Sequence, residues 1–194
     1  MHIILCDNID SGKSSFCMAL VRRLVGSGID ASGWVTPAFI EDGTKRGHDF
    51  VAIENNRIEE PIPFTRMHPF ASSVSFPDLS GDSPQATAFK SCPYHFNAKA
   101  FERANRIALE AAPSKGAQSL FIMDEIGPLE LFARGGFYRA ASAAFEKAPN
   151  ALVVVRKGLE EELCRAFPLI AFTVLGLADR AGVESALALS PPDL

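Results

Sequence analysis

The sequence predicts an α/β fold in which a mostly parallel sheet carries helices on both faces. Short apolar runs of strand length alternate with longer stretches of helical periodicity, which is the pattern of βαβ units joined by right-handed crossovers. The apolar runs 120–123 and 151–155 are uninterrupted, as in strands that are buried on both faces. The Asp42-Gly43 pair is a strong hairpin signal and adds a β-hairpin to the sheet.

The expected elements follow one another along the chain. Asn97 is predicted to cap a helix, because its side chain can accept a hydrogen bond from an amide of the first turn. The hairpin would pair residues 33–40 with residues 48–53. Strands are expected at 3–6, 33–40, 48–53, 120–123, 151–155 and 170–174, and helices at 16–21 with a stop at 25–28, and at 97–112, 136–147, 159–167 and 180–189.

The stretch from Arg57 to Tyr94 is the least regular part of the sequence. It carries six prolines and many serines, and it predicts a long loop with short strands at most. Loops of this length are functional or mobile, and this one is a candidate cover for a ligand. We interpret the chain as a single domain, 1–194, with an irregular insertion at about 57–94.

Composition excludes several classes of protein. The chain is 47% hydrophobic and 22% charged, as is common in soluble globular proteins, and its formal net charge is −4. That charge argues against a general nucleic-acid or membrane surface. No apolar run approaches the ~20 residues of a membrane span, and the N-terminus reads as a strand, so a cytoplasmic location is expected. The four cysteines form no Cys-x-x-Cys pair, which gives little support to a disulfide or a cysteine metal site.

The first motif is a loop that follows the apolar run 3–6 and precedes a helical pattern. Residues 7–14 match the template G-x-x-x-x-G-K-[ST], with Asp7 where the first glycine should stand. Loop amides would cradle a phosphate, Lys13 would reach the outer phosphates, and Ser14 would ligate Mg²⁺. The alternative is a strand-to-helix turn that contains Gly-Lys-Ser by chance. The predicted nucleotide-binding residues are Asn8, Ile9, Asp10, Ser11, Gly12, Lys13, Ser14 and Ser15.

Asp7 and Asp10 place two negative charges near a polyanion. One interpretation is that Asp7 makes the pocket less positive and weakens triphosphate binding. The other is that the Asp7 side chain turns away and bonds a backbone amide of the turn. The sequence leaves both interpretations open.

The second motif lies at the end of the predicted strand 120–123, where Asp124 and Glu125 follow an apolar run. An acidic residue in this position is the Walker B arrangement, in which Asp124 would hold Mg²⁺ opposite Ser14. Glu125 is placed to orient or deprotonate an attacking water. The alternative is a solvent-exposed strand end that happens to be acidic.

Together these segments resemble a family of small P-loop nucleoside-triphosphatases, the group that includes the human cancer-related enzyme. Residues 124–132, Asp-Glu-Ile-Gly-Pro-Leu-Glu-Leu-Phe, are similar to its D-E-I-G-x-x-E-L segment, and Glu130 falls on its second acidic position. Residues 33–36, 45–49, 97–101 and 156–158 resemble other family segments, whereas 57–94 matches poorly. The resemblance implies a single P-loop α/β domain and slow, Mg²⁺-dependent hydrolysis of several nucleoside triphosphates.

The sequence therefore predicts an Mg²⁺-dependent nucleoside-triphosphatase that cleaves the γ-phosphate of ATP- or GTP-type nucleotides, with Lys13 and Glu125 as catalytic residues and Ser14 and Asp124 as metal ligands. A cation should complete the site, and Arg46, Arg134 and Arg156 are the candidates. A small-molecule kinase that uses the same loop is one alternative, and a non-catalytic nucleotide-binding regulatory module is another. The preferred base, any protein partner and the oligomeric state do not follow from the sequence.

Overall fold

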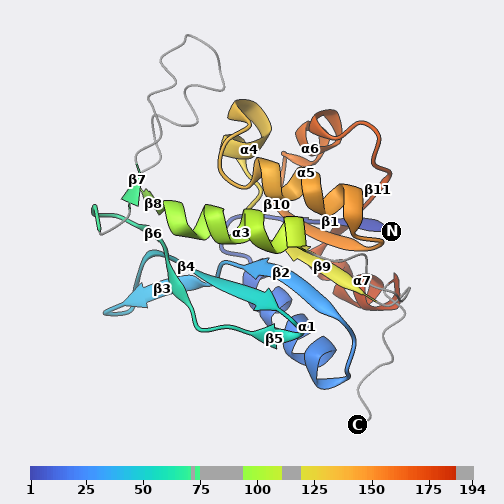
Figure 1. Cartoon of the computed structure of the whole chain (residues 1–194), viewed down its shortest axis with the longest axis horizontal. Coiled ribbons are helices and arrows are strands. Elements are labelled where there is room, and N and C mark those ends of the chain that lie inside the picture. The colour runs from blue at the N-terminus through green and yellow to red at the C-terminus, as the bar shows by residue number, and fades with distance from the viewer. Residues whose placement is uncertain (71–72, 75–93, 111–118, 187–194) are drawn as a thin grey trace.

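The structure is a computed structural model, and it describes residues 1–70, 73–74, 94–110 and 119–186 (Figure 1). Strands and helices alternate through most of this part of the chain. The strands are β1 (His2–Asp7), β2 (Ala31–Val35), β3 (Ala38–Glu41), β4 (Thr44–Glu54), β5 (Arg57–Ile58), β6 (Ile62–Arg66), β7 (Ser73–Val74), β8 (His95–Asn97), β9 (Leu120–Met123), β10 (Ala151–Arg156) and β11 (Phe172–Gly176). The helices are α1 (Lys13–Gly26), α3 (Ala98–Glu110), α4 (Pro128–Ala133), α5 (Tyr138–Lys147), α6 (Glu160–Ala166), the 3₁₀ helix η1 (Leu177–Asp179) and α7 (Arg180–Ala186).

In the described residues the strands join into one sheet of 11 strands, in the order β11-β1-β10-β9-β2-β4-β6-β8-β7, with β3 and β5 paired to β4. The strands from β11 to β2 run parallel to their neighbours, and the pairings from β2 to β7 are antiparallel. The predicted α/β class and attached hairpin are confirmed. Because β1, β10 and β9 are parallel, their carboxyl ends meet at one edge of the sheet, where α/β proteins bind ligands.

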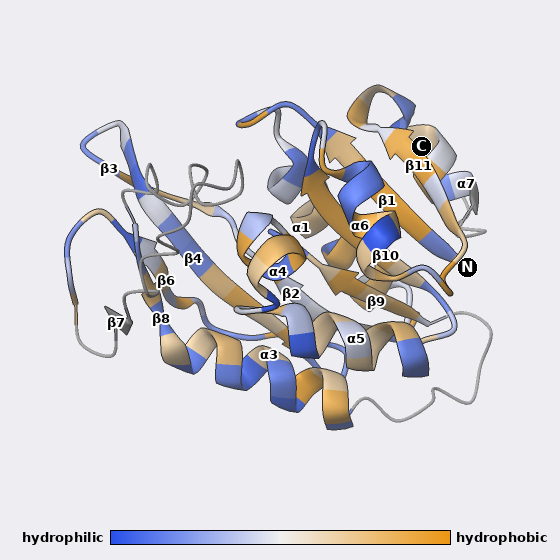
Figure 2. Ribbon diagram, turned by 90° about the horizontal axis from the view of Figure 1, so that it is seen from above, coloured by the Kyte–Doolittle hydropathy of each residue, from blue (hydrophilic) through white to orange (hydrophobic). Residues whose placement is uncertain are grey.

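Two apolar layers cover the two faces of the parallel strands. Successive residues of β1 point to opposite faces: Ile3 packs in the layer with Leu20 of α1, and Ile4 packs in the layer with Phe137. Helices α1 and α7 lie on the first face, and α3 and α5 lie on the second (Figure 1). Strands β1 and β10 appear as hydrophobic ribbons between these layers in Figure 2, as expected for buried strands.

An aromatic cluster lies beneath the junction of the parallel and antiparallel strands. Trp34 of β2 stacks on Phe137 with ring centroids 4.9 Å apart, and Phe50 and Phe101 also lie within 6.1 Å of the Phe137 ring. Phe64 joins the cluster from β6, so the stretch predicted to be irregular contributes to the core. Burial of this many rings fixes the position of β2, whose last residues adjoin the candidate site.

The predicted strand 33–40 was wrong in one respect, because it is two strands. β2 ends at Val35 and β3 begins at Ala38, with Thr36 and Pro37 between them. Pro37 has no N–H to give to a ladder, and a strand therefore breaks readily there. The return strand β4 begins at Thr44, earlier than the predicted 48. The turn between β3 and β4 is the predicted one, with Asp42 and Gly43 both at positive φ, 50° and 71°.

The remaining differences concern element ends and one helix. β11 covers 172–176 where 170–174 was predicted, and the short helix α4 was not predicted. Asn97 does cap α3, since its Oδ1 accepts a hydrogen bond from the Lys99 amide at 3.1 Å. Short strands occur within 57–74, whereas 75–93 and the predicted helical residues 111–112 and 187–189 lie outside the described residues. No helix of the described residues is long and apolar enough to cross a membrane.

Candidate active site at the carboxyl edge of the parallel strands

The loop between β1 and α1 has the backbone of an anion-binding turn. Asp10 and Gly12 adopt left-handed conformations, with φ of 57° and 96°. Turns of this kind direct successive N–H groups to one concave side, where they attract anions. Gly12 is also the N-cap of α1, a position where its left-handed backbone carries no penalty from a side chain.

The N-terminus of α1 carries no side-chain cap of its own. The N-cap residue, Gly12, has no side chain to bond the first amides of α1, and the first turn, Lys13, Ser14 and Ser15, holds no acidic residue. Helix N-termini usually satisfy these amides with a Ser, Thr, Asp or Asn side chain. An uncapped helix of 14 residues at the end of a buried strand keeps its positive end available for an anion.

Lys13 is buried and folds its ammonium over the loop. Its Nζ donates to the carbonyl oxygens of Asp7, at 2.9 Å, and of Asn8, and lies 3.3 Å from the Ser11 Oγ. The side chain is 9% exposed. The ammonium of Lys13 is thus held against the loop, where a phosphate oxygen would compete for it.

Asp124 is fully buried at the end of β9 and is held by hydrogen bonds. Its Oδ2 accepts from the Thr36 amide at 2.9 Å and from the Thr36 hydroxyl at 3.1 Å. The Ser14 hydroxyl lies near enough to the carboxylate to favour its ionised form. Desolvation and the neighbouring Glu125 charge raise the pKa of Asp124, and the bonds from Thr36 and the nearby Ser14 hydroxyl oppose this rise. The structure therefore places the two predicted metal ligands, Ser14 and Asp124, near each other at this edge of the sheet.

Glu125 has an unusual backbone and a cationic neighbour. Its φ is 63°, in the left-handed region that costs a residue with a Cβ on the order of 1 kcal/mol. Its amide bonds the Asp124 Oδ1 at 3.0 Å, and its Oε2 lies 4.0 Å from the Arg156 Nη2. Arg156 ends β10, the strand between β1 and β9, which places a guanidinium between the two motifs.

The other two cations considered from the sequence have different surroundings. Arg134 follows α4 and lies over the Tyr138 ring, with Cζ 5.7 Å from the ring centroid. Arg46 is an exposed residue of β4. Of the three candidates, Arg156 is the one that contacts Glu125.

Both oxygens of the Asp7 carboxylate are engaged by backbone amides. Oδ1 accepts from the Asn8 amide at 2.7 Å, and Oδ2 accepts from the Leu177 amide at 3.3 Å. Leu177 begins η1, directly after β11. This geometry matches the second interpretation of Asp7, in which the side chain fastens the turn.

Glu130 has a structural position. It is 4% exposed, and its two oxygens accept the Gly127 and Phe137 amides, each at 2.9 Å. Burial raises its pKa to about 7, although these amide bonds favour the ionised form. Glu130 therefore fixes the turn that follows Glu125 and the start of α5.

A hollow of about 510 Å³ adjoins the phosphate loop. It is lined by Asn8 and Ile9 of the loop, by Arg156 and Lys157 at the end of β10, and by Pro128 and Leu159. Its position at the carboxyl ends of β1 and β10, with two cationic residues in its wall, suits part of a nucleotide.

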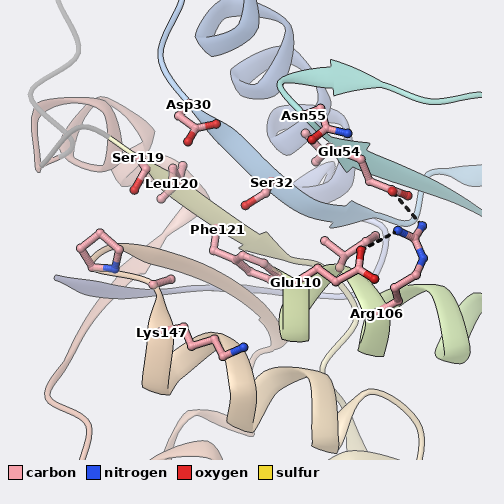
Figure 3. Close-up of a pocket in the computed structure, with 14 residues that line it drawn as sticks. Asp30, Ser32, Glu54, Asn55, Arg106, Glu110, Ser119, Leu120, Phe121 and Lys147 are labelled. Atoms are coloured by element: carbon pink, nitrogen blue, oxygen red, sulfur yellow. Dashed lines mark hydrogen bonds and ion pairs between the residues drawn. The ribbon is translucent and has the colours of Figure 1, made fainter. Parts of the chain in front are cut away.

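A second hollow, of about 260 Å³, lies at the opposite edge of the sheet (Figure 3). It is bounded by the ends of α3 and α5 and the starts of β2 and β9. Its Arg106 bridges Glu54 at 2.7 Å and Glu110 at 3.1 Å, so its charge is already balanced by carboxylates. This hollow is not lined by the loop between β1 and α1 or by the N-terminus of α1. The candidate nucleotide site is therefore the hollow at the carboxyl edge of the parallel strands.

Sequence reasoning missed the contribution of Thr36. The two bonds from Thr36 to Asp124 join residues 88 positions apart, and no local pattern predicts them. Trp34 adds a third link, from its Nε1 to the Asp124 carbonyl at 2.9 Å. The available signal was the place of Thr36 at the end of the segment 33–36, which resembles a family segment, although the predicted strand continued past it to residue 40.

A mostly parallel α/β sheet with this loop after β1 and an acidic residue after β9 is the architecture of P-loop nucleoside-triphosphatases. The family described as NTPase matches the chain over residues 2–174, and the chain belongs to this family. No curated protein matches it by sequence.

Two solved structures have the same fold. One is the solution structure of a human cancer-related nucleoside triphosphatase, with 21% identity, a TM-score of 0.62, and 96% of this chain and 95% of that chain covered. The other is the crystal structure of THEP1 from the hyperthermophile Aquifex aeolicus, with 20% identity, a TM-score of 0.63, and 96% and 99% of the two chains covered. At these identities the likeness establishes the fold.

Proposed function

We propose that the protein is an Mg²⁺-dependent nucleoside-triphosphatase that hydrolyses the γ-phosphate of ATP- or GTP-type nucleotides. The observation that carries the proposal is that the loop before α1 and Asp124 lie at the same carboxyl edge of the parallel strands, after β1 and β9, with Ser14 near enough to the Asp124 carboxylate to lower its pKa. A phosphate loop and an acidic strand end serve one reaction only if they meet, and in this member of the NTPase family they do.

In this proposal the loop binds the phosphates through its amides. Residues 8–15 surround the inner phosphates, and the uncapped end of α1 adds its dipole. Lys13 exchanges the carbonyl oxygens of Asp7 and Asn8 for phosphate oxygens, so that its charge meets the charge that grows on the transferred group.

Ser14 and Asp124 fit Mg²⁺ by the chemistry of their donors. Both offer oxygen, and Mg²⁺ is typically held by one or two carboxylates together with phosphate oxygens and waters. When bound, Mg²⁺ would neutralise negative charge on the outer phosphates.

Glu125 is the proposed general base. Its strained backbone supports a functional role, because such strain persists mainly where a side chain must be aimed. The carboxylate would orient a water in line with the γ-phosphate and accept its proton. Arg156, 4.0 Å from Glu125, would hold that carboxylate or meet the departing phosphate.

Binding and turnover of the Glu125→Gln variant and the wild type distinguish the proposed hydrolase from a small-molecule kinase and from a non-catalytic regulatory module. We expect Glu125→Gln to bind a non-hydrolysable triphosphate as the wild type does, and to lose phosphate release by ~10²-fold or more. Glu102→Gln, on the exposed face of α3, is the matched control and should keep full turnover.

Unchanged phosphate release in Glu125→Gln would mean that the base lies elsewhere. Release that requires an added small-molecule acceptor would support a kinase. Tight triphosphate binding by the wild type without any release would support a regulatory module.

A further inference from the structure

The β3–β4 hairpin reaches across to the phosphate loop. Lys45 is the second residue of β4. It forms an ion pair through its Nζ with the Asp10 Oδ1, although the two residues are 35 positions apart. The Lys45 side chain is 26% exposed and that of Asp10 is 63% exposed. The hairpin therefore supplies a cation to the rim of the loop, and neither sequence motif includes it.

The strand that carries Lys45 is fixed from its other side by β6. Arg66 donates to the His48 carbonyl at 2.6 Å, pairs with Asp49 at 2.5 Å, and lies over the Phe39 ring with Cζ 3.8 Å from its centroid. These contacts fasten both strands of the hairpin. At Gly47 the backbones of β4 and β6 approach so closely that a Cβ would lie 1.9 Å from the Thr65 carbonyl oxygen. A residue two positions from such a contact has little freedom to move with its strand.

The charges around Lys45 come from several elements of the candidate site. The hydrogen bond and charge of Lys45, with the charge of Lys13, lower the pKa of Asp10, against the effect of its burial. Burial, reinforced by Lys45, lowers the pKa of His48 to about 4, so this imidazole is neutral near pH 7. The hairpin begins directly after Thr36 and Pro37, and Thr36 bonds Asp124, so the hairpin starts on the side of the loop on which Asp124 lies.

We propose that Lys45 binds the terminal phosphate of a bound nucleoside triphosphate and that Asp10 positions its ammonium. This inference rests on the proposed function and adds a binding residue to it. The loop amides serve the inner phosphates and Lys13 reaches the outer ones, and the terminal phosphate must lie toward Asp124 and Glu125 to be attacked. Lys45 approaches from that side. It bridges Asp10 and a phosphate oxygen, since an ammonium has three donors.

The Lys45–Asp10 ion pair is expected to contribute little to the stability of the fold. Exposed pairs of this kind contribute little to folding, because solvent screens them and ordering two long side chains is unfavourable. A carboxylate in a phosphate loop would also repel the ligand. Pairing Asp10 with a lysine removes that repulsion and holds a donor where the ligand arrives.

The test is the affinity of wild type and variants for a non-hydrolysable ATP analogue and for ADP, measured by titration calorimetry. We expect Lys45→Met to weaken binding of the ATP analogue about tenfold or more and to change ADP affinity by less than about threefold. Lys45→Arg, which keeps the charge, should retain most of the affinity. Lys99→Met, on the exposed face of α3, should match the wild type. Equal affinities of Lys45→Met and wild type for the ATP analogue would overturn the inference.

The same substitution in an Asp10→Asn background separates contact from neutralisation. If Lys45 touches the phosphate, Lys45→Met still weakens binding of the ATP analogue when Asp10 carries no charge. If the loss disappears there, or if ADP is weakened equally, Lys45 only neutralises Asp10 and the inference is overturned. A third outcome is that the wild type binds the ATP analogue, Lys13→Ala does not bind it, and Lys45→Met binds it as the wild type does. That result refutes this inference and leaves the proposed function standing. A wild type that binds no triphosphate refutes both.

Discussion

Replacing Thr36 by valine tests the support of Asp124 directly. Valine has nearly the same shape as threonine, so Thr36→Val removes one hydrogen bond, 3.1 Å long, from a fully buried carboxylate and leaves the amide bond in place. A hydrogen bond to a charged group contributes about 1.5–3 kcal/mol. For a chain of this size that corresponds to a melting temperature lower by about 3–12 °C.

The chain offers a matched control in Thr65. Its hydroxyl is also buried and bonds the His48 Nδ1 at 3.0 Å, but that imidazole is neutral near pH 7. Thr65→Val should therefore cost about 1 kcal/mol, as a bond between neutral groups does. Urea denaturation at pH 7, followed by circular dichroism, gives both free energies of unfolding, compared through their midpoints at a common slope. Equal losses in the two variants, or a smaller loss in Thr36→Val, would refute the reasoning that Asp124 is held as a carboxylate.

Three further predictions follow from the contacts described above. Asp7→Asn should not tighten triphosphate binding at low or high salt, because the carboxylate serves to bond two amides, of which an amide side chain can accept only one; tighter binding at low salt would show that its charge acts on the pocket. His48→Gln should flatten the pH dependence of stability between pH 6.5 and 4. The folded pKa of His48, about 4, lies below the unfolded value, so the unfolded chain binds more protons and the wild type loses up to ~3 kcal/mol as the pH falls; parallel pH profiles would contradict this. Glu130→Gln should unfold more easily by about 1–3 kcal/mol, because an amide group cannot accept both backbone N–H bonds, and an unchanged urea midpoint would argue against that role.

Local patterns were sufficient for the parts of the site that are contiguous in sequence. The loop that ends in Gly12-Lys13-Ser14 lies between a strand and a helix, and each has its own periodicity. The sequence predicted both the strand and the helix. Asp124 and Glu125 follow a short apolar strand whose bounds, 120–123, were predicted correctly. In these cases the candidate site residues and the secondary structure that positions them are encoded in the same short segments.

What the sequence could not provide depends on the order of the strands and on distant contacts. No local sequence pattern predicts that β10 lies between β1 and β9. That strand order brings Arg156 close to Glu125. The orientation of Asp7 is set by the Leu177 amide, 170 positions away. Thr36 reaches Asp124 only because β2 pairs with β9. Each is a tertiary contact that no periodicity records.

The break between β2 and β3 was mispredicted for a different reason. Pro37 was visible in the sequence, but its neighbours are good strand formers, and a strand pattern on both sides concealed the interruption. The structure uses that interruption, since Thr36 leaves the ladder there and turns its hydroxyl and amide to Asp124. The position where the pattern failed is therefore part of the candidate site.

The central claim is tested most directly by the rate of inorganic phosphate release from ATP and GTP in the presence of Mg²⁺ and without any acceptor, compared between wild type and Lys13→Ala. The account predicts steady release by the wild type and a loss of most of it in a variant that keeps the wild-type circular dichroism spectrum, because Lys13 carries the charge at the centre of the loop. No release by the wild type, or equal release by a folded Lys13→Ala, would contradict it.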